Sequence, residues 1–370
     1  MTARTHRAAA LACFSLLLLG APVRAKTPQA IEPGRHVLEG SDVSVYNLAG
    51  EMRIVEGSGS SVVVEITTAG KDKDRLTAEI RRDAEGRPSL RVIYPENHVV
   101  YHEFGFGPPE GSDSRSSLDY LGHRATVTGR GPGLEAHADI RILVPRGKTV
   151  HAHNAVGRAL LTGVDGNVSF EGASSDVEAS EVSGSLSVDL GSGNVSVSRA
   201  DANTTIDTGS GNITLSHLNG NVSVDAGSGD VVMRGVGSER ISIDAGSGTI
   251  TGSDIRATKI SADCGSGEID LDGAAVGTLA LQAGSGSVHL KLTQNIEQLA
   301  ISTGSGSVKL EAPRDLSARF RIECPKRNLH IDFPTQIERG EDDLTVGTIG
   351  SGHGKIDIEA GSGNVVLIRM

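Results

Sequence analysis

Evenly spaced carboxylates are the clearest candidates for chemistry in this chain. They recur every 18 or 19 residues, each between an apolar residue and a small or apolar one: Asp189, Asp207, Asp225, Asp244 and Asp263. If each interval is one turn of a repeating fold, the carboxylates form an outward column about 4.8 Å apart. Carboxylate oxygens are ligands for Ca²⁺, but one carboxylate per turn supplies few ligands, and the Gly-Gly-x-Gly-x-Asp repeat of calcium β-rolls is absent. We therefore interpret the column as a solvated face and predict no metal site.

A second candidate region spans residues 95–133, which are rich in Pro, Gly and Ser. A connection of this length is predicted to be functional or mobile. Its aromatic residues and one histidine suggest a partner-binding loop or a cover for one end of the fold: Tyr101, His102, Phe104, Phe106 and Tyr120. Imidazole and carboxylate are metal ligands, but the spacing of His98, His102, Glu103 and His123 matches no tight metal motif. We predict no metal here either.

No residues are spaced for catalysis or for a cofactor. No Ser/His/Asp or Cys/His set is recognisable, and the glycine-rich triplets lack the Lys and the following helix of a phosphate-binding loop. The net charge of −11 argues against nucleic acid. The absence of Trp and the 3% aromatic content argue against a sugar-degrading cleft. The sequence predicts a protein that is not an enzyme and binds no cofactor.

The element that must position these residues is a repeat. The triplet Gly-Ser-Gly recurs at intervals of 18 to 20 residues and then twice more near the end, starting at Gly191, Gly209, Gly227, Gly246, Gly265, Gly284, Gly304, Gly350 and Gly361. A fixed period of this length indicates a solenoid in which each repeat forms one coil. Alternating apolar residues flank each triplet, which indicates strands with one buried face. We predict an all-β fold, a right-handed parallel β-helix of 18–20-residue coils.

Stacked coils place equivalent residues in columns. One inward column is predicted to hold branched residues: Val195, Ile213, Val231, Ile250, Ile269, Val288 and Val308. A second inward column holds small residues beside the corner: Thr208, Ala226, Ala245, Cys264, Ala283 and Thr303. Cys324 falls in the same phase, three coils beyond Cys264, which is about 14 Å and too far for a disulfide. We predict two free, buried and inert thiols. His289 and His330 share an outward column with Lys309 and are interpreted as surface residues.

The chain divides into three parts. Residues 1–25 combine a basic start with a short apolar run and indicate a signal peptide that is cleaved after Ala25. Residues 26–150 are predicted to form a β-rich N-terminal cap and first coils, interrupted by the 95–133 loop. Residues 151–370 are predicted to form the solenoid. The mature chain would carry a charge of about −14 because three arginines leave with the signal peptide. We expect an exported protein that is periplasmic, on the cell surface or extracellular.

Taken together, these motifs resemble the bacterial putative-adhesin family of β-strand-repeat domains of unknown function. The resemblance rests on the repeated Gly-Ser-Gly-polar-[Val/Ile]-x-[Val/Leu] pattern, on the segment 142–147 that leads into the first coil, and on the closing segment 354–364. It covers about residues 40–370 and implies an exported parallel β-helix with no catalytic residues to transfer. The 95–133 loop departs from the family pattern.

We therefore expect a non-enzymatic interaction protein of the envelope or cell surface, which binds an envelope component or a protein partner and contacts membranes peripherally at most. Two alternatives stay open. An apolar last strand, Val365 to Ile368, would let copies stack head to tail as a structural polymer. The β-helix class also contains polysaccharide-active enzymes, although a fold does not define a function.

Overall fold

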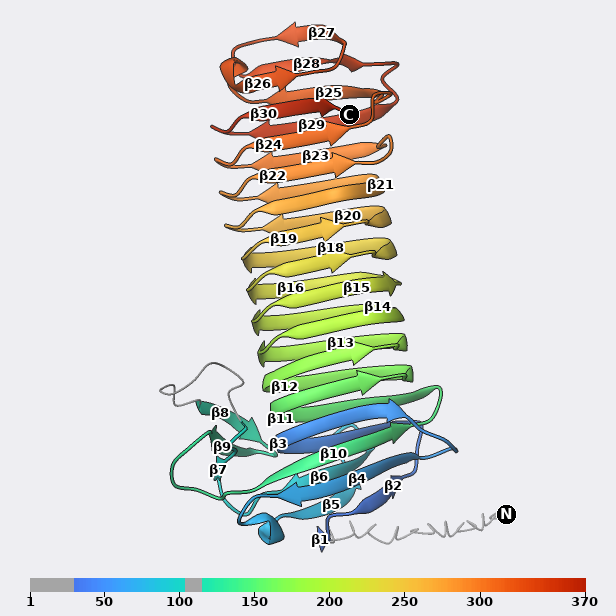
Figure 1. Ribbon diagram of the computed structural model, residues 1–370, viewed down its shortest axis with the longest axis vertical. Coiled ribbons are helices and arrows are strands. Elements are labelled where there is room, and N and C mark those ends of the chain that lie inside the picture. Colours follow the sequence, from blue (N-terminus) through green and yellow to red (C-terminus); the bar gives the residue numbers. More distant parts are fainter. Residues whose placement is uncertain (1–29, 104–114) are drawn as a thin grey trace, which may run out of the picture.

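The computed structural model describes residues 30–103 and 115–370, and these residues form a tall stack of strands on a broader base. The described residues contain no α-helix, only the two short 3₁₀ helices η1 (Lys73–Arg75) and η2 (Lys326–Asn328). A 27-stranded sheet contains every strand except three, which form a separate small sheet. The all-β prediction is confirmed, and the fold is β-solenoid-like (Figure 1).

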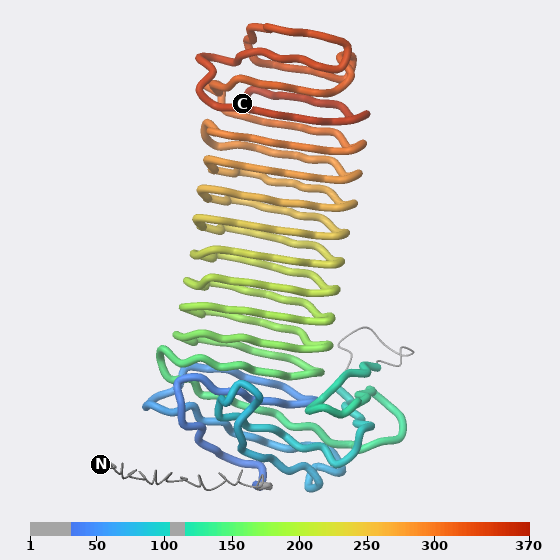
Figure 2. Tube along the Cα trace, turned by 180° about the vertical axis from the view of Figure 1, so that it is seen from behind, coloured from blue at the N-terminus to red at the C-terminus, as the bar shows by residue number. Residues whose placement is uncertain are grey.

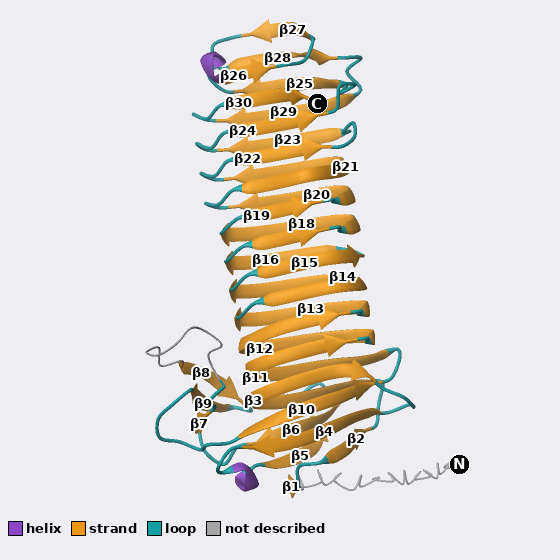
Figure 3. Cartoon of the chain, viewed as in Figure 1, coloured by secondary structure: helices purple, strands orange, loops and turns teal. Residues whose placement is uncertain are grey.

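The stack is built from parallel strands in the order of the sequence (Figures 1 and 3). Its strands are β11 (Lys148–Thr162), β12 (Asp165–Ser180), β13 (Ser183–Ser192), β14 (Val195–Ser210), β15 (Ile213–Asn219), β16 (Val222–Ser228), β17 (Val231–Arg234), β18 (Gly237–Ser247), β19 (Ile250–Ser253), β20 (Arg256–Cys264), β21 (Ile269–Ala283), β22 (Val288–Leu292), β23 (Gln298–Thr303) and β24 (Val308–Ala312). The trace in Figure 2 runs as flattened coils, one above the next.

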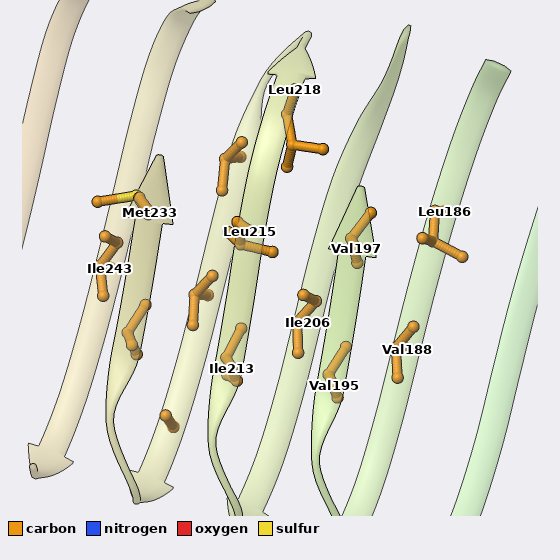
Figure 4. Close-up of a cluster of buried hydrophobic side chains, with 14 of the residues drawn as sticks. Leu186, Val188, Val195, Val197, Ile206, Ile213, Leu215, Leu218, Met233 and Ile243 are labelled. Carbon is orange, nitrogen blue, oxygen red and sulfur yellow. The ribbon is translucent and has the colours of Figure 1, made fainter. Parts of the chain in front are cut away.

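Both predicted inward columns are confirmed by strand register. Val195 pairs with Ile213, and Ile213 pairs with Val231. The branched residues of this column are all buried and pack against the opposite wall of the coil (Figure 4). The second column continues the same way through Ala245, Cys264 and Ala283. Because successive side chains of a strand point to opposite faces, one face of each of these stacked strands faces the core and the other faces solvent.

Asparagine and aspartate side chains connect neighbouring coils along one edge of the stack. The Oδ1 of Asn194 accepts a hydrogen bond from the backbone N–H of Asn212 at 3.0 Å, and Asn212 accepts one from Asp230 at 3.0 Å. Asp230 in turn accepts from Thr249 at 2.8 Å. Each side chain satisfies a backbone donor that the turn leaves unpaired. This explains why a polar residue follows each glycine triplet.

A second corner of the coil lies in the left-handed region of the backbone. Its residues recur with the period of the repeat and include four that are not glycine: Gly163, Glu181, Arg199, His217, Gly235, Asp254 and Gly273. The φ angle of His217 is 54°, and that of Arg199 is 50°. Left-handed backbone costs a residue with a Cβ about 1–2 kcal/mol, whereas glycine adopts it freely.

Replacing the exposed His217 by glycine should therefore stabilise the protein. Relief of the left-handed strain exceeds the entropy that glycine loses on folding, so we expect a gain of about 0.5–1 kcal/mol in the free energy of unfolding. Urea unfolding followed by circular dichroism measures it. Ser216→Gly, one residue earlier and with ordinary backbone angles, is the matched control and should lower stability. A His217→Gly protein no more stable than the wild type would contradict the strain argument.

The base is formed by strands that precede the regular coils: β1 (Ala30–Ile31), β2 (Arg35–Leu38), β3 (Asp42–Glu56), β4 (Val62–Ala69), β5 (Thr77–Arg82), β6 (Pro88–Ile93) and β10 (His137–Val144). Strand β3 pairs in parallel with β11 along most of its length and so begins the stack. Antiparallel pairs of β4 with β2 and with β10 close the base below it.

A buried polar network holds the base to the first coil. Asn47 donates to Asn154 Oδ1 at 2.9 Å and to the Ala138 carbonyl at 2.7 Å. The Tyr94 hydroxyl donates to Asn47 Oδ1 at 2.9 Å. Both asparagines are fully buried. Strand register continues the inward column of small residues from Thr208 toward the base through Leu190 and Gly172, and the two asparagines come next in that column. Satisfied networks of this kind fix one arrangement of the backbone.

The 95–133 segment is not a simple loop. It contains β7 (His98–Val100), β8 (Arg115–Tyr120) and β9 (His123–Thr128), which form a separate three-stranded sheet in the order β7-β9-β8. Leu121 and Gly122 make the turn between β8 and β9 with φ angles of 51° and 86°. We call β8, this turn and β9 the side hairpin; Figure 1 shows it beside the lowest coils.

The end of the chain departs from the predicted order of coils. The last strands are β25 (Ala318–Glu323), β26 (Leu329–Ile331), β27 (Thr335–Gly340), β28 (Leu344–Ile349), β29 (Gly354–Ala360) and β30 (Val365–Arg369). Strand β29 lies between β23 and β25, and β30 lies between β24 and β26. The expectation that the apolar last strand is an exposed end is therefore wrong. The charged hairpin β27–β28 closes the stack instead (Figure 1).

The inserted coil also changes the separation of the cysteines. Cys264 and Cys324 are free and buried, as predicted. They lie four strand steps apart instead of three, because β29 intervenes between β23 and β25. That separation is about 19 Å, beyond the reach of a disulfide. Burial raises the pKa of both thiols, which favours the unreactive protonated form.

Candidate functional site

The predicted aspartate column exists. Register places Asp189 beside Asp207, Asp207 beside Asp225, and Asp244 beside Asp263. Asp225 pairs with Asp244 in between, so the five carboxylates form one outward row across the face of the stack. Burial raises the pKa of Asp189, and the neighbouring charges of Asp207 and Glu171 raise it further.

Four residues extend this row toward the base and change its character. In strand order they are Arg91, Tyr46, His153 and Glu171, and Glu171 lies directly beside Asp189. The Tyr46 and His153 rings stack with centroids 4.2 Å apart and planes 2° apart. The Arg91 guanidinium carbon lies 4.9 Å from the Tyr46 ring centre. We call these four residues the junction row, because they lie where the base meets the coils.

The junction row ends in a charge-assisted hydrogen bond. His153 Nδ1 lies 2.8 Å from Glu171 Oε2. This bond lowers the pKa of Glu171 below its ordinary value of 4.5, although partial burial acts in the opposite direction. The other ring nitrogen, Nε2 of His153, is buried and has no hydrogen-bond partner. Glu171 and Asp189 lie in adjacent strands, and their pKa values are thus shifted in opposite directions: that of Glu171 is lowered and that of Asp189 is raised.

A groove of about 450 Å³ opens over the junction row. One wall consists of Tyr46, Arg91, His153, Glu171 and Asp189, and the other consists of residues 118–121 of the side hairpin. The hairpin is fixed to the base because the Tyr120 hydroxyl donates to the Val92 carbonyl at 2.7 Å. The Tyr120 ring also meets Tyr94 edge-on at 6.1 Å. We call this cavity the junction groove.

An ion cluster anchors the strand that carries Arg91. Asp83 accepts hydrogen bonds at 2.7 Å from the Ser44 hydroxyl and from Arg87 Nε. Burial alone would raise the pKa of Asp83, but these bonds lower it to about 2. Beside the cluster, His151 Nε2 lies 3.1 Å from Asp42. Burial lowers the pKa of His151. The cluster ties β6 to β3 and so fixes the position of Arg91.

The structure separates the residues proposed for the partner-binding loop. Tyr101 is buried and stacks at an angle on His137 at 4.8 Å, so it is not available to a partner; that assignment is wrong. His102 is exposed and pairs with Glu135 at 2.9 Å, away from the groove residues. Tyr120 lines the junction groove. Phe104 and Phe106 lie outside the described residues. In the described part of the chain, no group of three His, Cys, Asp or Glu residues is arranged to hold a metal.

The opposite end of the same face has a smaller groove of about 350 Å³. It forms where Ala280 and Ala300 replace the serines of earlier coils, and Arg321 and Lys355 border it. Arg321 is paired with Asp357 at 3.3 Å. Lys355 lies 3.9 Å from the same aspartate. Both cations of this smaller groove are thus paired within the protein, unlike Arg91 of the junction row.

The sequence analysis missed the junction row. Glu171 and His153 lie 18 and 36 residues before Asp189, so the repeat period would have placed both in the aspartate column. Tyr46 and Arg91 carry no periodic signal because the chain between them and the coils is irregular. Only the pairing of β6 with β3, and of β3 with β11, brings them into the row.

The Glu171 pKa gives a test of the junction row. His153→Phe keeps a ring beside Tyr46 but removes the hydrogen bond, so the pKa of Glu171 should rise toward 4.5. Because the folded-state pKa is lowered, its stabilisation is present above pH 4.5 and is lost as pH falls through the folded value. Carboxyl NMR titration measures the shift. His289→Phe, on the other face of the stack, should leave Glu171 unchanged; equal pKa values in both variants would refute the assignment.

The fold and its polar face define a β-solenoid-like protein that carries a groove at its base. The Toastrack DUF4097 family model matches residues 140–367, so the chain belongs to this family, whose function is not known. A solved structure described as a putative cell adhesion protein from Clostridium sporogenes is similar at 9% identity. That match covers 93% of this chain and 100% of the other, with a TM-score of 0.19. No curated protein shows significant similarity.

Proposed function

We propose that the protein is an exported, non-enzymatic interaction protein of the cell envelope, built as a right-handed solenoid of 18–20-residue coils. Its partner binds along the polar face and is selected at the junction groove. The observation that carries this proposal is the junction groove itself, where a fixed hairpin faces a row of charged and aromatic side chains. Extended faces of solenoids commonly serve as binding surfaces. In the described part of the chain, no helix is long and apolar enough to cross a membrane.

The test is co-sedimentation of the purified full chain with bacterial envelope fractions. Removing residues 95–133 would delete a folded sheet, so point variants are better. Leu118→Ser changes the groove wall, and Leu118 is only partly buried. We expect saturable binding that weakens at least tenfold in this variant. Thr214→Ser, on the opposite face, is the control. Equal binding by both variants would remove the groove from the proposal, and no binding at all would overturn the envelope role.

The polymer alternative has lost its motivating observation, because β30 is interior. Pelleting of the pure protein without envelope material would nevertheless support self-assembly and count against the proposed role.

One observation favours the enzymatic alternative as a second candidate. Glu171 and Asp189 occupy adjacent strands in one groove, with the pKa of Glu171 lowered and that of Asp189 raised. Pairs of carboxyl groups shifted in opposite directions serve as base and acid in glycoside hydrolysis. Release of reducing ends from a panel of acidic glycans, abolished in Glu171→Gln, would establish this activity. Glycans left intact by the wild type would dismiss it.

A further inference from the structure

Arg91 is a buried cation that forms no ion pair within the described residues. Its cross-strand neighbour in β5, Glu79, is paired with Arg81 instead. The residue is only 7% exposed, and its Nε is buried without a hydrogen-bond partner. Within the described residues no carboxylate lies within 4.0 Å of its guanidinium, whereas Arg87 on the approach to the same strand is paired with Asp83 at 2.7 Å. An unpaired buried charge is costly and is ordinarily satisfied by an anion. The planar guanidinium matches a carboxylate, which accepts two parallel hydrogen bonds.

Arg91 is placed where a ligand can reach it. It borders the junction groove and also a smaller cavity of about 200 Å³ beneath the side hairpin. The junction groove is lined by one arginine but by three carboxylates, Asp119, Glu171 and Asp189. Repulsion from these carboxylates disfavours a dianion such as phosphate more than a single carboxylate. The apolar side chains of Leu118 and Leu121 offer contact to an uncharged part of the ligand.

The free edge of β8 identifies the class of ligand. Among the described strands, β8 is hydrogen-bonded to β9 alone and is the edge of its sheet. Three consecutive residues of β8, 118–120, line the junction groove together with Leu121 of the turn. Because neighbouring side chains of a strand point to opposite faces, this run along β8 indicates that the edge of the strand faces the groove. Unpaired backbone groups at such an edge hydrogen-bond to an added strand.

We propose that the junction groove binds an extended peptide, which adds as a strand to β8 and places one carboxylate on Arg91. The carboxylate is either the C-terminus of the peptide or an Asp or Glu side chain, since both present the same group. This inference rests on the proposed interaction role and names its partner class. His153 and Tyr46 hold the Arg91 side chain in position by stacking.

The test uses two random hexapeptide libraries, N-acetylated, with either a free C-terminal carboxylate or a C-terminal amide. Each library is equilibrated with the full chain, and bound peptides are sequenced. We expect enrichment of peptides with alternating apolar residues and a carboxylate. A C-terminal carboxylate would enrich only the acid library, whereas a side-chain carboxylate would enrich Asp or Glu at one position of both. For the best peptide, Arg91→Gln should weaken binding at least tenfold, and Arg91→Lys should weaken it less.

Arg141→Gln is the control, because Arg141 is on β10 of the base, lines neither cavity and is paired with Glu65 at 3.2 Å. It should bind as the wild type does. Circular dichroism checks that Arg91→Gln and Arg91→Lys are folded. Enrichment without a carboxylate, full binding by folded Arg91→Gln, or no enrichment in either library would overturn the inference. Envelope binding that persists in any of these cases would leave the proposed function standing.

Discussion

Gly267→Ala is expected to destabilise the protein more than any other exchange of glycine for alanine within the coils. A Cβ at Gly267 would lie 1.6 Å from the backbone oxygen of Gly248 in the preceding coil. Gly286 repeats the geometry one coil later, with 1.7 Å to the oxygen of Gly267. The atom in the way is a backbone oxygen that also accepts a hydrogen bond from the Cys264 thiol at 3.0 Å, so no side-chain rotation relieves the contact. We expect a loss of about 3 kcal/mol or more in the free energy of unfolding.

Urea unfolding followed by far-ultraviolet circular dichroism measures this loss. Gly340→Ala is the matched control, since the nearest atom to its added Cβ is Ile337 Cγ2 at 3.7 Å and its backbone is not left-handed. The control should stay within about 0.5 kcal/mol of the wild type. An unchanged urea midpoint for Gly267→Ala would mean that the corners can separate, and the close stacking described for them would be wrong.

The sequence predicted whatever depended on the repeat period. Because identical corners stack in register, the period alone assigned Val195 and Ile213 to the core and Asp207 and Asp225 to the solvent face. It also separated Cys264 from Cys324, which made a disulfide impossible. These predictions required only the alternation of side chains along a strand and the spacing of strands in a sheet.

The left-handed corner was not predictable in the same way. Glu181, Arg199 and His217 occupy it without the glycine that usually marks such backbone. The surrounding strand pairing holds these residues in a conformation that their own preferences oppose. A weak signal existed in Gly163, Gly235 and Gly273, which share the phase of the corner, but Gly-rich repeats contain glycine at many phases.

Only part of the candidate site, the aspartate column, could be predicted from the sequence. The aspartate column belongs to the regular coils and followed from the period. Arg91 and Tyr46 come from strands before the regular coils, where the sequence has no period and pairing between distant strands decides which residues meet. The side hairpin was interpreted as part of a loop because its strands are short and the segment is rich in Pro and Gly.

The order of the last coils follows from corner chemistry that the sequence does contain. Gly361 and Gly363 stack on Gly304 and Gly306, so the coil with a complete Gly-Ser-Gly corner joins the regular stack. Residues 313–340 lack that triplet and cannot continue the corner. The chain therefore passes outward first, through β25 to β28, and returns to place β29 and β30 inside. Spacing along the chain alone predicted that the coils would stack in sequence order, with β29 and β30 outermost.

This interior position makes Leu367→Asp the second substitution with a large expected effect. Leu367 is fully buried and pairs with Leu310 on one side and Ile331 on the other. A carboxylate there has no partner in an apolar core, so we expect a loss of about 4 kcal/mol. Hydrogen exchange of the backbone amides in β24 and β26 measures the loss where it occurs, and urea unfolding measures it for the whole chain.

Val366→Asp, one residue earlier, is the matched control. Val366 points outward between Lys309 and His330, where a carboxylate is solvated and faces a cation, so stability should change by about 0.5 kcal/mol or less. Equal losses in the two variants would contradict the assignment of Leu367 to the core and Val366 to the outer face.

The interior position of β30 also reverses the expectation for truncation: removing residues 365–370 exposes the paired edges of β24 and β26. Association of copies should then increase, because unpaired edges recruit other strands. Weaker association after truncation would show that β30 is itself the contact between copies.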